Sequence, residues 1–451
     1  MSTTRDWHTD LRDMARFAAP IVLINVGQQA MGVVDTLMVG RLGGAAIASV
    51  ALGNFYFFNV CIFGIGLLFA LDPVVSQAIG AGATDDAARG IQRGLFMAVL
   101  IAVVVSVALW PSADVLRLMQ QPEDVVRETG VYVRHRALGA LPFLLFNAMR
   151  QSLQALRNTR PVIVAVLIAN VVNAFANWVL INGHLGFSPM GVAGSGYATA
   201  IAMWSMAGLL WWFAAPVLRP YVRPWRPEAT AWAPLKRTLR IGIPIGTQFF
   251  FESFAFGLTA LFMGWMGTAS LAGHEIALNM AAMTFMVPLG ISGAAAAVVG
   301  HAVGRNDMPS ARRDALAAIV CGTGFMTLSA AVFLVAPEWL ATSYTHDPAT
   351  VAVAVALIPL AGWFQVFDGL QAVTSGVLRG TGDTKVPAVL HMLAFWGVGV
   401  PLGAFLGFRT PLRERGLWIG LVAGLAAAAI LQSMRVATRL RGNILRLTVD
   451  H

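Results

Sequence analysis

The composition of this 451-residue chain is that of a membrane protein. Hydrophobic residues make up 57% of the chain, charged residues only 12%, and the mean hydropathy is +0.70. A soluble protein of this length has no interior large enough to bury so much apolar surface, so a soluble enzyme or binding protein is excluded. The net charge of +9 would suit nucleic acid, but the basic residues are spread along the chain. We therefore expect no nucleic-acid partner.

Twelve apolar segments are long enough to cross a bilayer as helices, because a helix needs roughly 20 residues to span the hydrocarbon. We expect them at about 17–39, 51–79, 94–112, 129–150, 162–182, 191–216, 241–263, 270–300, 314–336, 350–378, 388–406 and 416–434. The sequence thus predicts an all-α integral membrane protein with twelve transmembrane helices, whose surroundings are the lipid bilayer.

The basic residues between these segments are distributed by side. If the N-terminus is cytoplasmic, 23 of the 31 Lys and Arg residues fall in cytoplasmic segments and 8 on the other side. The positive-inside rule then predicts a multi-pass protein with both termini in the cytoplasm. The even number of segments agrees with this orientation.

The longest polar break, residues 218–240, divides the twelve segments into two groups of six. Its prolines argue against a continuous helix, so we expect a cytoplasmic linker between an N-lobe, 1–217, and a C-lobe, 241–451. The halves resemble each other at one offset of 224 residues: Pro20 aligns with Pro244, and VVSQAIG at 74–80 aligns with VVGHAVG at 298–304. This duplication predicts two pseudo-symmetric six-helix lobes around a central cavity.

Three acidic residues, Asp35, Glu252 and Asp368, lie inside the apolar segments. A charge at bilayer depth is costly and by default marks a functional site. The sequence places no Lys or Arg at comparable depth to neutralise these carboxylates. Each can therefore take up a proton or bind a metal cation, which is the chemistry of an ion-coupled transporter.

Polar residues at helical spacing accompany the acids. Single-face stripes are formed by Asn25, Gln28, Gly32 and Asp35; by Asn147, Gln151 and Gln154; by Asn170, Asn173 and Asn177; by Gln248, Glu252 and Thr259; and by Gln365, Asp368, Gln371 and Ser375. Polar groups lack partners in hydrocarbon, so these stripes are expected to line an interior. For the Asn and Gln residues, hydrogen bonding between helices remains an alternative to a functional role.

Several local motifs carry a family resemblance. VDTLMVGRLG follows the first segment, GVAGSGYATAI lies in the sixth, AGHEIALN opens the eighth and LRGTGDTKVP follows the tenth. With the paired turns VSQAIGAG and VGHAVGRND, they resemble the multidrug and toxic compound extrusion (MATE) transporters over nearly the whole chain. Glu252 and Asp368 are similar to the acids of the NorM-like branch.

The resemblance implies a function as well as a fold. It implies a secondary active multidrug efflux antiporter that exports bulky, often cationic organic compounds and drugs in exchange for sodium or protons. It implies no enzymatic activity, no cofactor other than the coupling ion, and a monomer in the bacterial cytoplasmic (inner) membrane.

The resemblance also implies site residues. Asp35 with Asn173, Asn177, Ser195 and Thr199 is similar to the N-lobe cation site, and the one-turn spacing of Asn173 and Asn177 and of Ser195 and Thr199 supports this independently. Glu252 and Asp368 are similar to the C-lobe coupling carboxylates. Sodium is a possible ligand of Asp35, Glu252 and Asp368, since hard cations prefer oxygen. Expected substrate contacts are Gln28, Gln248, Phe251 and Gln371.

Two other classes of protein share some of these features. A lipid or polysaccharide precursor flippase would have the same architecture, but should place cationic residues inside its cavity to hold phosphate groups. An intramembrane enzyme would need a fixed catalytic pair, whereas these acids are divided between the two halves of the duplication.

Overall fold

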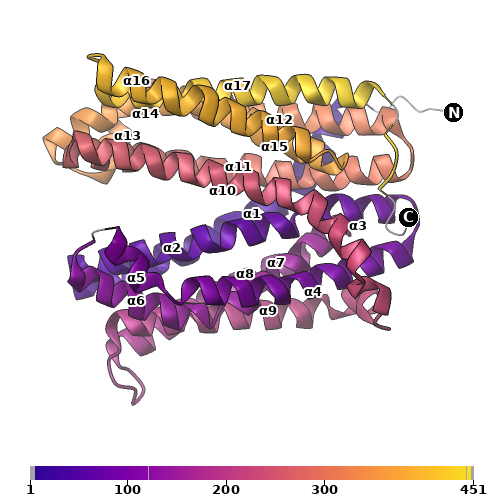
Figure 1. Ribbon diagram of the computed structural model, residues 1–451, viewed down its shortest axis with the longest axis horizontal. Coiled ribbons are helices and arrows are strands. Elements are labelled where there is room, and N and C mark those ends of the chain that lie inside the picture. The colour runs from indigo at the N-terminus through magenta and orange to yellow at the C-terminus, as the bar shows by residue number, and fades with distance from the viewer. Residues whose placement is uncertain (1–5, 120, 443, 448–451) are drawn as a thin grey trace. The chain divides into compact units, whose positions relative to one another are not determined.

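The computed structural model describes residues 6–119, 121–442 and 444–447, and these are almost wholly helical, without β-strands (Figure 1). The α-helices are α1 (Trp7–Val39), α2 (Gly44–Leu68), α3 (Leu71–Gly80), α4 (Thr84–Leu109), α5 (Ser112–Leu118), α6 (Glu123–Ala137), α7 (Ala140–Ala155), α8 (Arg160–Asn182), α9 (Gly191–Val222), α10 (Trp232–Met266), α11 (Thr268–Gly304), α12 (Met308–Val335), α13 (Pro337–Tyr344), α14 (Pro348–Gly380), α15 (Lys385–Met392), α16 (Val400–Arg409) and α17 (Arg413–Arg441). Short turns η1 (Gly40–Leu42) and η2 (Pro227–Thr230) and a π-helix, η3 (Leu393–Gly399), complete the described elements. The predicted all-α class is confirmed.

Among the described residues, eleven helical segments are long and apolar enough to cross a membrane. The predicted fourth segment, 129–150, is different, because the structure divides it into α6 and α7, of 15 and 16 residues. The two residues between them, Leu138 and Gly139, keep backbone angles in the right-handed helical region. Taken together, α6 and α7 therefore supply the twelfth segment.

Contacts divide the described chain into two compact units. One, here called the C-unit, comprises residues 6–22, 76–82 and most of 247–447; the other, the N-unit, comprises 23–75 and 83–246 except residue 120. Each unit thus contains most of one half of the duplication and a smaller piece of the other. The lobe boundaries 1–217, 218–240 and 241–451 stay a prediction about the duplication, which this division by contacts does not test.

Helices α1 and α10 each belong to both units. The division falls between Val22 and Leu23 in α1 and between Gly246 and Thr247 in α10, positions that correspond at the offset of 224. Pro20 and Pro244 lie two residues before these points. A proline inside a helix removes a backbone hydrogen bond and favours a kink. The duplicated proline thus explains why each helix changes units at the same place.

The first part of α10 packs in the N-unit and the first part of α1 packs in the C-unit, and each is held there by a contact with an equivalent glycine. In the N-unit, a Cβ atom on Gly66 of α2 would lie 2.4 Å from the Cα atom of Gly246 in α10. In the C-unit, a Cβ atom on Gly290 of α11, which corresponds to Gly66, would lie 2.8 Å from the backbone nitrogen of Val22 in α1. Small residues allow membrane helices to approach backbone to backbone. The same close packing therefore fixes the start of α10 in one unit and of α1 in the other.

The duplicated heptapeptides also contact each other, within the C-unit. A Cβ atom on Gly80 would lie 2.2 Å from the carbonyl oxygen of His301, and one on Gly304 would lie 2.2 Å from that of Gln77. Because Gln77 corresponds to His301 and Gly80 to Gly304, each residue contacts the equivalent of its own partner. This reciprocity is the pattern of a local two-fold contact between the two copies of the heptapeptide.

The predicted linker at 218–240 is shorter than expected. Helix α9 continues through Pro216 and Pro220 to Val222, and α10 begins at Trp232, so only the residues between them, with η2, leave the α-helix. Prolines are tolerated inside membrane helices when neighbouring groups satisfy the freed backbone atoms. The expected break in the helix is therefore present, but it is confined to residues 223–231.

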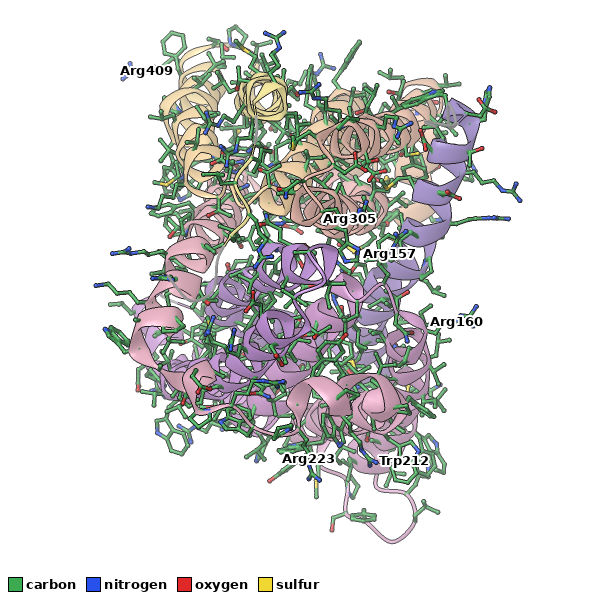
Figure 2. All side chains as sticks on the ribbon, turned by 90° about the vertical axis from the view of Figure 1, so that its right-hand side faces the viewer. Arg157, Arg160, Trp212, Arg223, Arg305 and Arg409 are labelled. Carbon is green, nitrogen blue, oxygen red and sulfur yellow. The ribbon has the colours of Figure 1, made fainter. Side chains whose placement is uncertain are left out.

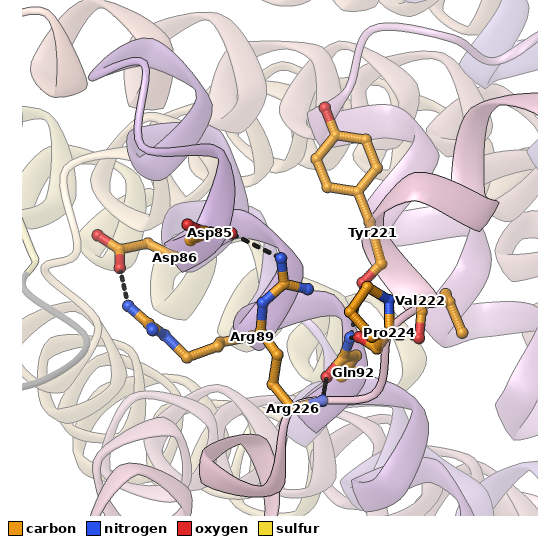
Figure 3. Close-up of polar contacts among 8 residues, drawn as sticks. All are labelled: Asp85, Asp86, Arg89, Gln92, Tyr221, Val222, Pro224 and Arg226. Atoms are coloured by element: carbon orange, nitrogen blue, oxygen red, sulfur yellow. Dashed lines mark hydrogen bonds and ion pairs between the residues drawn. The ribbon is translucent and has the colours of Figure 1, made fainter.

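One glutamine of α4 anchors this linker inside the N-unit (Figure 3). Gln92 Nε2 donates to the carbonyl oxygens of Tyr221, Val222 and Pro224 at 2.9, 3.2 and 2.9 Å, and Gln92 Oε1 accepts from the backbone nitrogen of Arg226 at 2.8 Å. The side chain thus satisfies carbonyl groups that the end of α9 leaves free.

Basic side chains project from the same end of this unit. Arg160, at the start of α8, and Arg223, directly after α9, point away from the ribbon (Figure 2). Both belong to the segments that the distribution of charge assigns to the cytoplasm.

The glycine contact gives a stability prediction. We expect Gly66→Ala to lower the unfolding temperature of the purified protein in detergent, because its Cβ atom would collide with backbone atoms of α10 that no rotamer change can move. Overpacking of this kind costs about 1–3 kcal/mol. The matched control is Gly208→Ala in α9, where nothing lies within 4 Å of the added atom. If both variants melt like the wild type, Gly66 does not hold α10 in place.

Candidate functional site

The carboxylate of Asp35 lies fully buried in the N-unit and accepts three hydrogen bonds. Asn173 Nδ2 and Asn177 Nδ2 of α8 donate to Asp35 Oδ1 at 2.9 and 2.8 Å, and Thr199 Oγ1 of α9 donates to Oδ2 at 2.8 Å. Ser195, one helical turn before Thr199, is buried beside them. The five residues of the predicted N-lobe site are therefore gathered by α1, α8 and α9.

Helical spacing and one glycine explain this convergence. Asn173 and Asn177 are four residues apart and so share one face of α8, as Ser195 and Thr199 share one face of α9. Gly194 lets the two helices meet, because a Cβ atom there would lie 2.6 Å from the carbonyl oxygen of Leu180. A larger residue would separate α8 from α9 and move the donors away from Asp35.

Three oxygen atoms of this cluster are buried without a hydrogen-bond partner: Asn173 Oδ1, Asn177 Oδ1 and Ser195 Oγ. With the Asp35 carboxylate they form an oxygen-rich group of the kind that a hard cation prefers. The amide nitrogens, however, are the atoms that face the carboxylate. These donors satisfy a negatively charged carboxylate. The role of these residues as a cation site stays a prediction.

A cation lies near Asp35, contrary to the expectation from the sequence. Arg136, in the last turn of α6, acts electrostatically on Asp35 and hydrogen-bonds the side chains of Asn54 and Tyr132. The expectation that no Arg or Lys lies at the depth of the three acids is therefore wrong for Asp35. The Arg136 side chain, which is partly buried, also lies over the buried ring of Phe57.

A buried arginine contacts a predicted substrate residue. Arg150 of α7 donates from Nη1 to Gln28 Oε1 of α1 and acts electrostatically on Asp72, both within the N-unit. Gln28 corresponds to Glu252 at the offset of 224, and Arg150 corresponds to Gln371 when Phe146 is aligned with Phe367. The charge therefore differs between the halves, with the cation Arg150 in the N-unit and the carboxylate Glu252 in the C-unit.

The two acids of the C-unit lie close together. Asp368 of α14 is buried and interacts electrostatically with Glu252 of α10. His391 of α15 places Nε2 3.5 Å from Glu252 Oε2, and its Nδ1 lies 3.2 Å from the amide nitrogen of Gln371. Because an amide nitrogen can only donate, Nδ1 accepts and Nε2 carries the hydrogen that faces Glu252.

Sequence reasoning missed His391. His391 has no neighbouring residues at the spacing of metal ligands, and its partners Gln371 and Glu252 are 20 and 139 residues away along the chain. The one available signal was a polar residue within the apolar run VPAVLHMLAFWG. That pattern predicts burial but does not identify the partner.

The remaining expected substrate residues lie on the same helices. Gln248 is buried one turn before Glu252 on α10, and Phe251 packs edge-on against Trp396 with ring centroids 5.9 Å apart. Trp396 also stacks on the half-exposed Phe254 at 5.7 Å. These rings form an aromatic group beside Glu252, and their contact with a substrate stays a prediction.

The Asp35 cluster gives a stability prediction that compares a hydrogen bond between two helices with one inside a single helix. Thr199→Val keeps the shape of the side chain but removes a donor to a buried carboxylate, so we expect the unfolding temperature to fall by the equivalent of about 1.5–3 kcal/mol. Thr259→Val is the control, because Thr259, also buried, bonds only to the carbonyl oxygen of Ala255 in its own helix. Equal melting of the two variants would contradict the geometry described for Asp35.

Known proteins resemble this chain over nearly its whole length. A multidrug resistance protein of Pseudomonas aeruginosa, PmpM, is 35% identical over 96% of this chain and 92% of its own, and a probable multidrug resistance protein NorM of Mesorhizobium japonicum is 37% identical over 94% of this chain and 93% of its own. The crystal structure of the eukaryotic MATE transporter AtDTX14 matches with a TM-score of 0.88 at 20% identity, over 97% of this chain and all of that one.

The model of the MatE family matches the chain twice, at residues 20–179 and 244–405. The two matches begin at Pro20 and Pro244, the positions from which the internal duplication was aligned. The twelve predicted segments, the duplicated halves and the NorM-like relatives therefore agree on one assignment. The chain belongs to the MatE family.

Proposed function

We propose that this chain is a multidrug efflux antiporter of a bacterial cytoplasmic membrane. It exports bulky, often cationic organic compounds in exchange for sodium ions or protons, as a monomer with both termini in the cytoplasm. The relatives named above support the multidrug part of this proposal, and the pair formed by the partly buried Glu252 and the buried Asp368 carries the antiport part.

Two interacting carboxylates in a membrane interior are stabilised by a cation. Among the ion pairs of the described residues, Glu252 has only the imidazole of His391, and the electrostatic interaction of Asp368 is with Glu252 itself. Like charges in a low dielectric repel, so binding a proton, a sodium ion or an organic cation lowers the free energy of the pair. Ion and drug then compete for one negative site, and this competition is the basis of exchange.

The membrane potential supplies enough energy for this exchange. One elementary charge moving down the potential releases about 2.3 kcal/mol per 100 mV. Each 1.4 kcal/mol corresponds to a tenfold ratio, so one ion supports a gradient of roughly 40-fold per 100 mV for a neutral drug. No nucleotide-binding loop is needed to drive transport.

The aromatic group beside Glu252 suits organic cations. Phe251 and Phe254 lie within one turn of Glu252 along α10 and pack against Trp396 of η3, and aromatic faces attract quaternary and protonated amines. A positively charged, planar drug is therefore the substrate class that this surface favours.

A flippase of lipid or polysaccharide precursors is the second candidate, because Arg150 is a buried cation of the kind that could hold a phosphate group. The bond from Arg150 to Gln28 and its interaction with Asp72 occupy this cation, which favours the drug antiporter.

Efflux from cells tests the proposal. Cells that express the wild-type chain should export ethidium and norfloxacin, and the double variant Glu252→Gln/Asp368→Asn should retain both compounds like cells with empty vector, because the competing negative charge is gone. The control is Glu338→Gln on the exposed part of α13, which should export both compounds at the wild-type rate.

Equal retention of both compounds by wild-type cells and the double variant would refute drug antiport. Repeating the assay with and without sodium, and at different external pH, identifies the coupling ion. Movement of a fluorescent phospholipid in vesicles with the purified chain, and no efflux of either drug, would favour the flippase.

A further inference from the structure

The last described residues of the chain, 444–447, here called the C-terminal tail, pack against the C-unit. Helix α17 ends at Arg441, and Arg312 of α12 donates from Nε to the carbonyl oxygen of Leu440 at 2.7 Å and from Nη2 to that of Arg441 at 3.2 Å. These bonds satisfy carbonyl groups that the end of a helix leaves free. Ile444 is buried in the core that α1, α11, α12, α14 and α17 form.

One glutamine joins this tail to α3. Gln77 is fully buried, accepts at Oε1 from the backbone nitrogen of Leu447 at 2.8 Å, and donates from Nε2 to the carbonyl oxygen of Gly380 at 2.9 Å. The Leu447 side chain covers the turn after α14, where a Cβ atom on Gly382 would lie 3.0 Å from Leu447 Cδ1. Gln77 therefore links the tail to the end of α14.

The turn under the tail is itself fixed to α17. Asp383 Oδ2 lies 2.7 Å from Arg435 Nε, and Gly382 has a φ angle of +77°, which glycine adopts without strain. The tail thus rests on a surface that α14 and α17 hold in place.

The position of Gln77 in the chain gives these contacts a second consequence. Residues 76–82, here called the crossing segment, belong to the C-unit, whereas the described residues on either side, 23–75 and 83–119, belong to the N-unit. Alternating access in transporters moves one bundle of helices against the other. Such a movement pulls on the crossing segment from both ends, and the bond from the tail to Gln77 opposes its removal from the C-unit.

We propose that the C-terminal tail is a strap that holds the crossing segment in the C-unit, and that the turnover of transport depends on this hold. The tail contains none of the acidic residues and none of the expected drug contacts, so its loss should change the rate of turnover and leave the affinity for the drug unaltered. The part of this inference that concerns turnover rests on the proposed antiport.

Hydrogen exchange of the purified protein, measured by mass spectrometry, tests the strap. A chain that ends at Gly442 lacks the tail, and a chain that ends at Leu447 keeps it and is the matched control. We expect the amides of the crossing segment to exchange about two- to tenfold faster in the shorter chain, the range that one intramolecular hydrogen bond contributes to local opening. The amides of α8 in the N-unit should exchange equally in both chains.

Ethidium transport in vesicles, driven by an imposed sodium or pH gradient, tests the role in turnover. The shorter chain should have a severalfold lower turnover number than the chain that ends at Leu447, with the same KM for ethidium. A general loss of folded protein would instead lower the exchange protection of α8 as well.

Equal exchange of the crossing segment in the two chains would overturn the strap, as would faster exchange in the crossing segment and α8 alike. Equal turnover by both chains would overturn its role in transport, as would a changed KM. If the shorter chain does not fold, Leu447→Pro in the full chain decides the question with the same outcomes, because proline lacks the N–H group that Gln77 accepts while Ile444 stays in the core. Absence of ethidium transport by the wild type would refute the antiport, whereas the exchange measurement would still test the strap.

Discussion

A carboxylate inside a membrane must be compensated, and the two acidic clusters meet this constraint in different ways. Asp35 accepts three hydrogen bonds and has Arg136 nearby, so its charge is balanced by the chain itself. Among the described contacts, Glu252 and Asp368 have each other, an imidazole and an amide, so a cation that binds there lowers the free energy of the pair. This difference is why we propose that the second cluster takes part in the exchange.

The duplication shows how this difference arose on one scaffold. Both halves kept three features: the proline of the first helix, Pro20 or Pro244; the glycine that contacts the first helix of the other half, Gly66 or Gly290; and the heptapeptide at 74–80 or 298–304. At the functional positions the halves differ: Gln28 corresponds to Glu252 and Arg150 to Gln371. Backbone contacts that only glycine permits leave no freedom for substitution, whereas side chains facing an interior can change charge without moving a helix.

Much of this arrangement was predictable from sequence because it depends on local periodicity. The four-residue spacing of Asn173 and Asn177 predicted one helical face, and their convergence on Asp35 followed from burial of that face. Arg136 was not predictable, because counting charges by side places it at the outer surface, and its contact with Asn54 joins residues 82 apart in the chain. His391 was missed because its contact with Glu252 joins segments 139 residues apart. Contacts between helices that are far apart in the chain depend on how the helices pack, which the spacing of residues along one helix does not predict.

The central claim is that the pair of Glu252 and Asp368 carries the exchange of ion and drug. Ethidium transport driven by an imposed sodium or pH gradient, measured in vesicles with the purified chain, tests it most directly when two variants are compared. The account predicts that Glu338→Gln, on the exposed part of α13, transports ethidium in response to the gradient like the wild type, whereas Glu252→Gln/Asp368→Asn does not. Gradient-driven transport at the wild-type rate by the folded double variant would contradict the account.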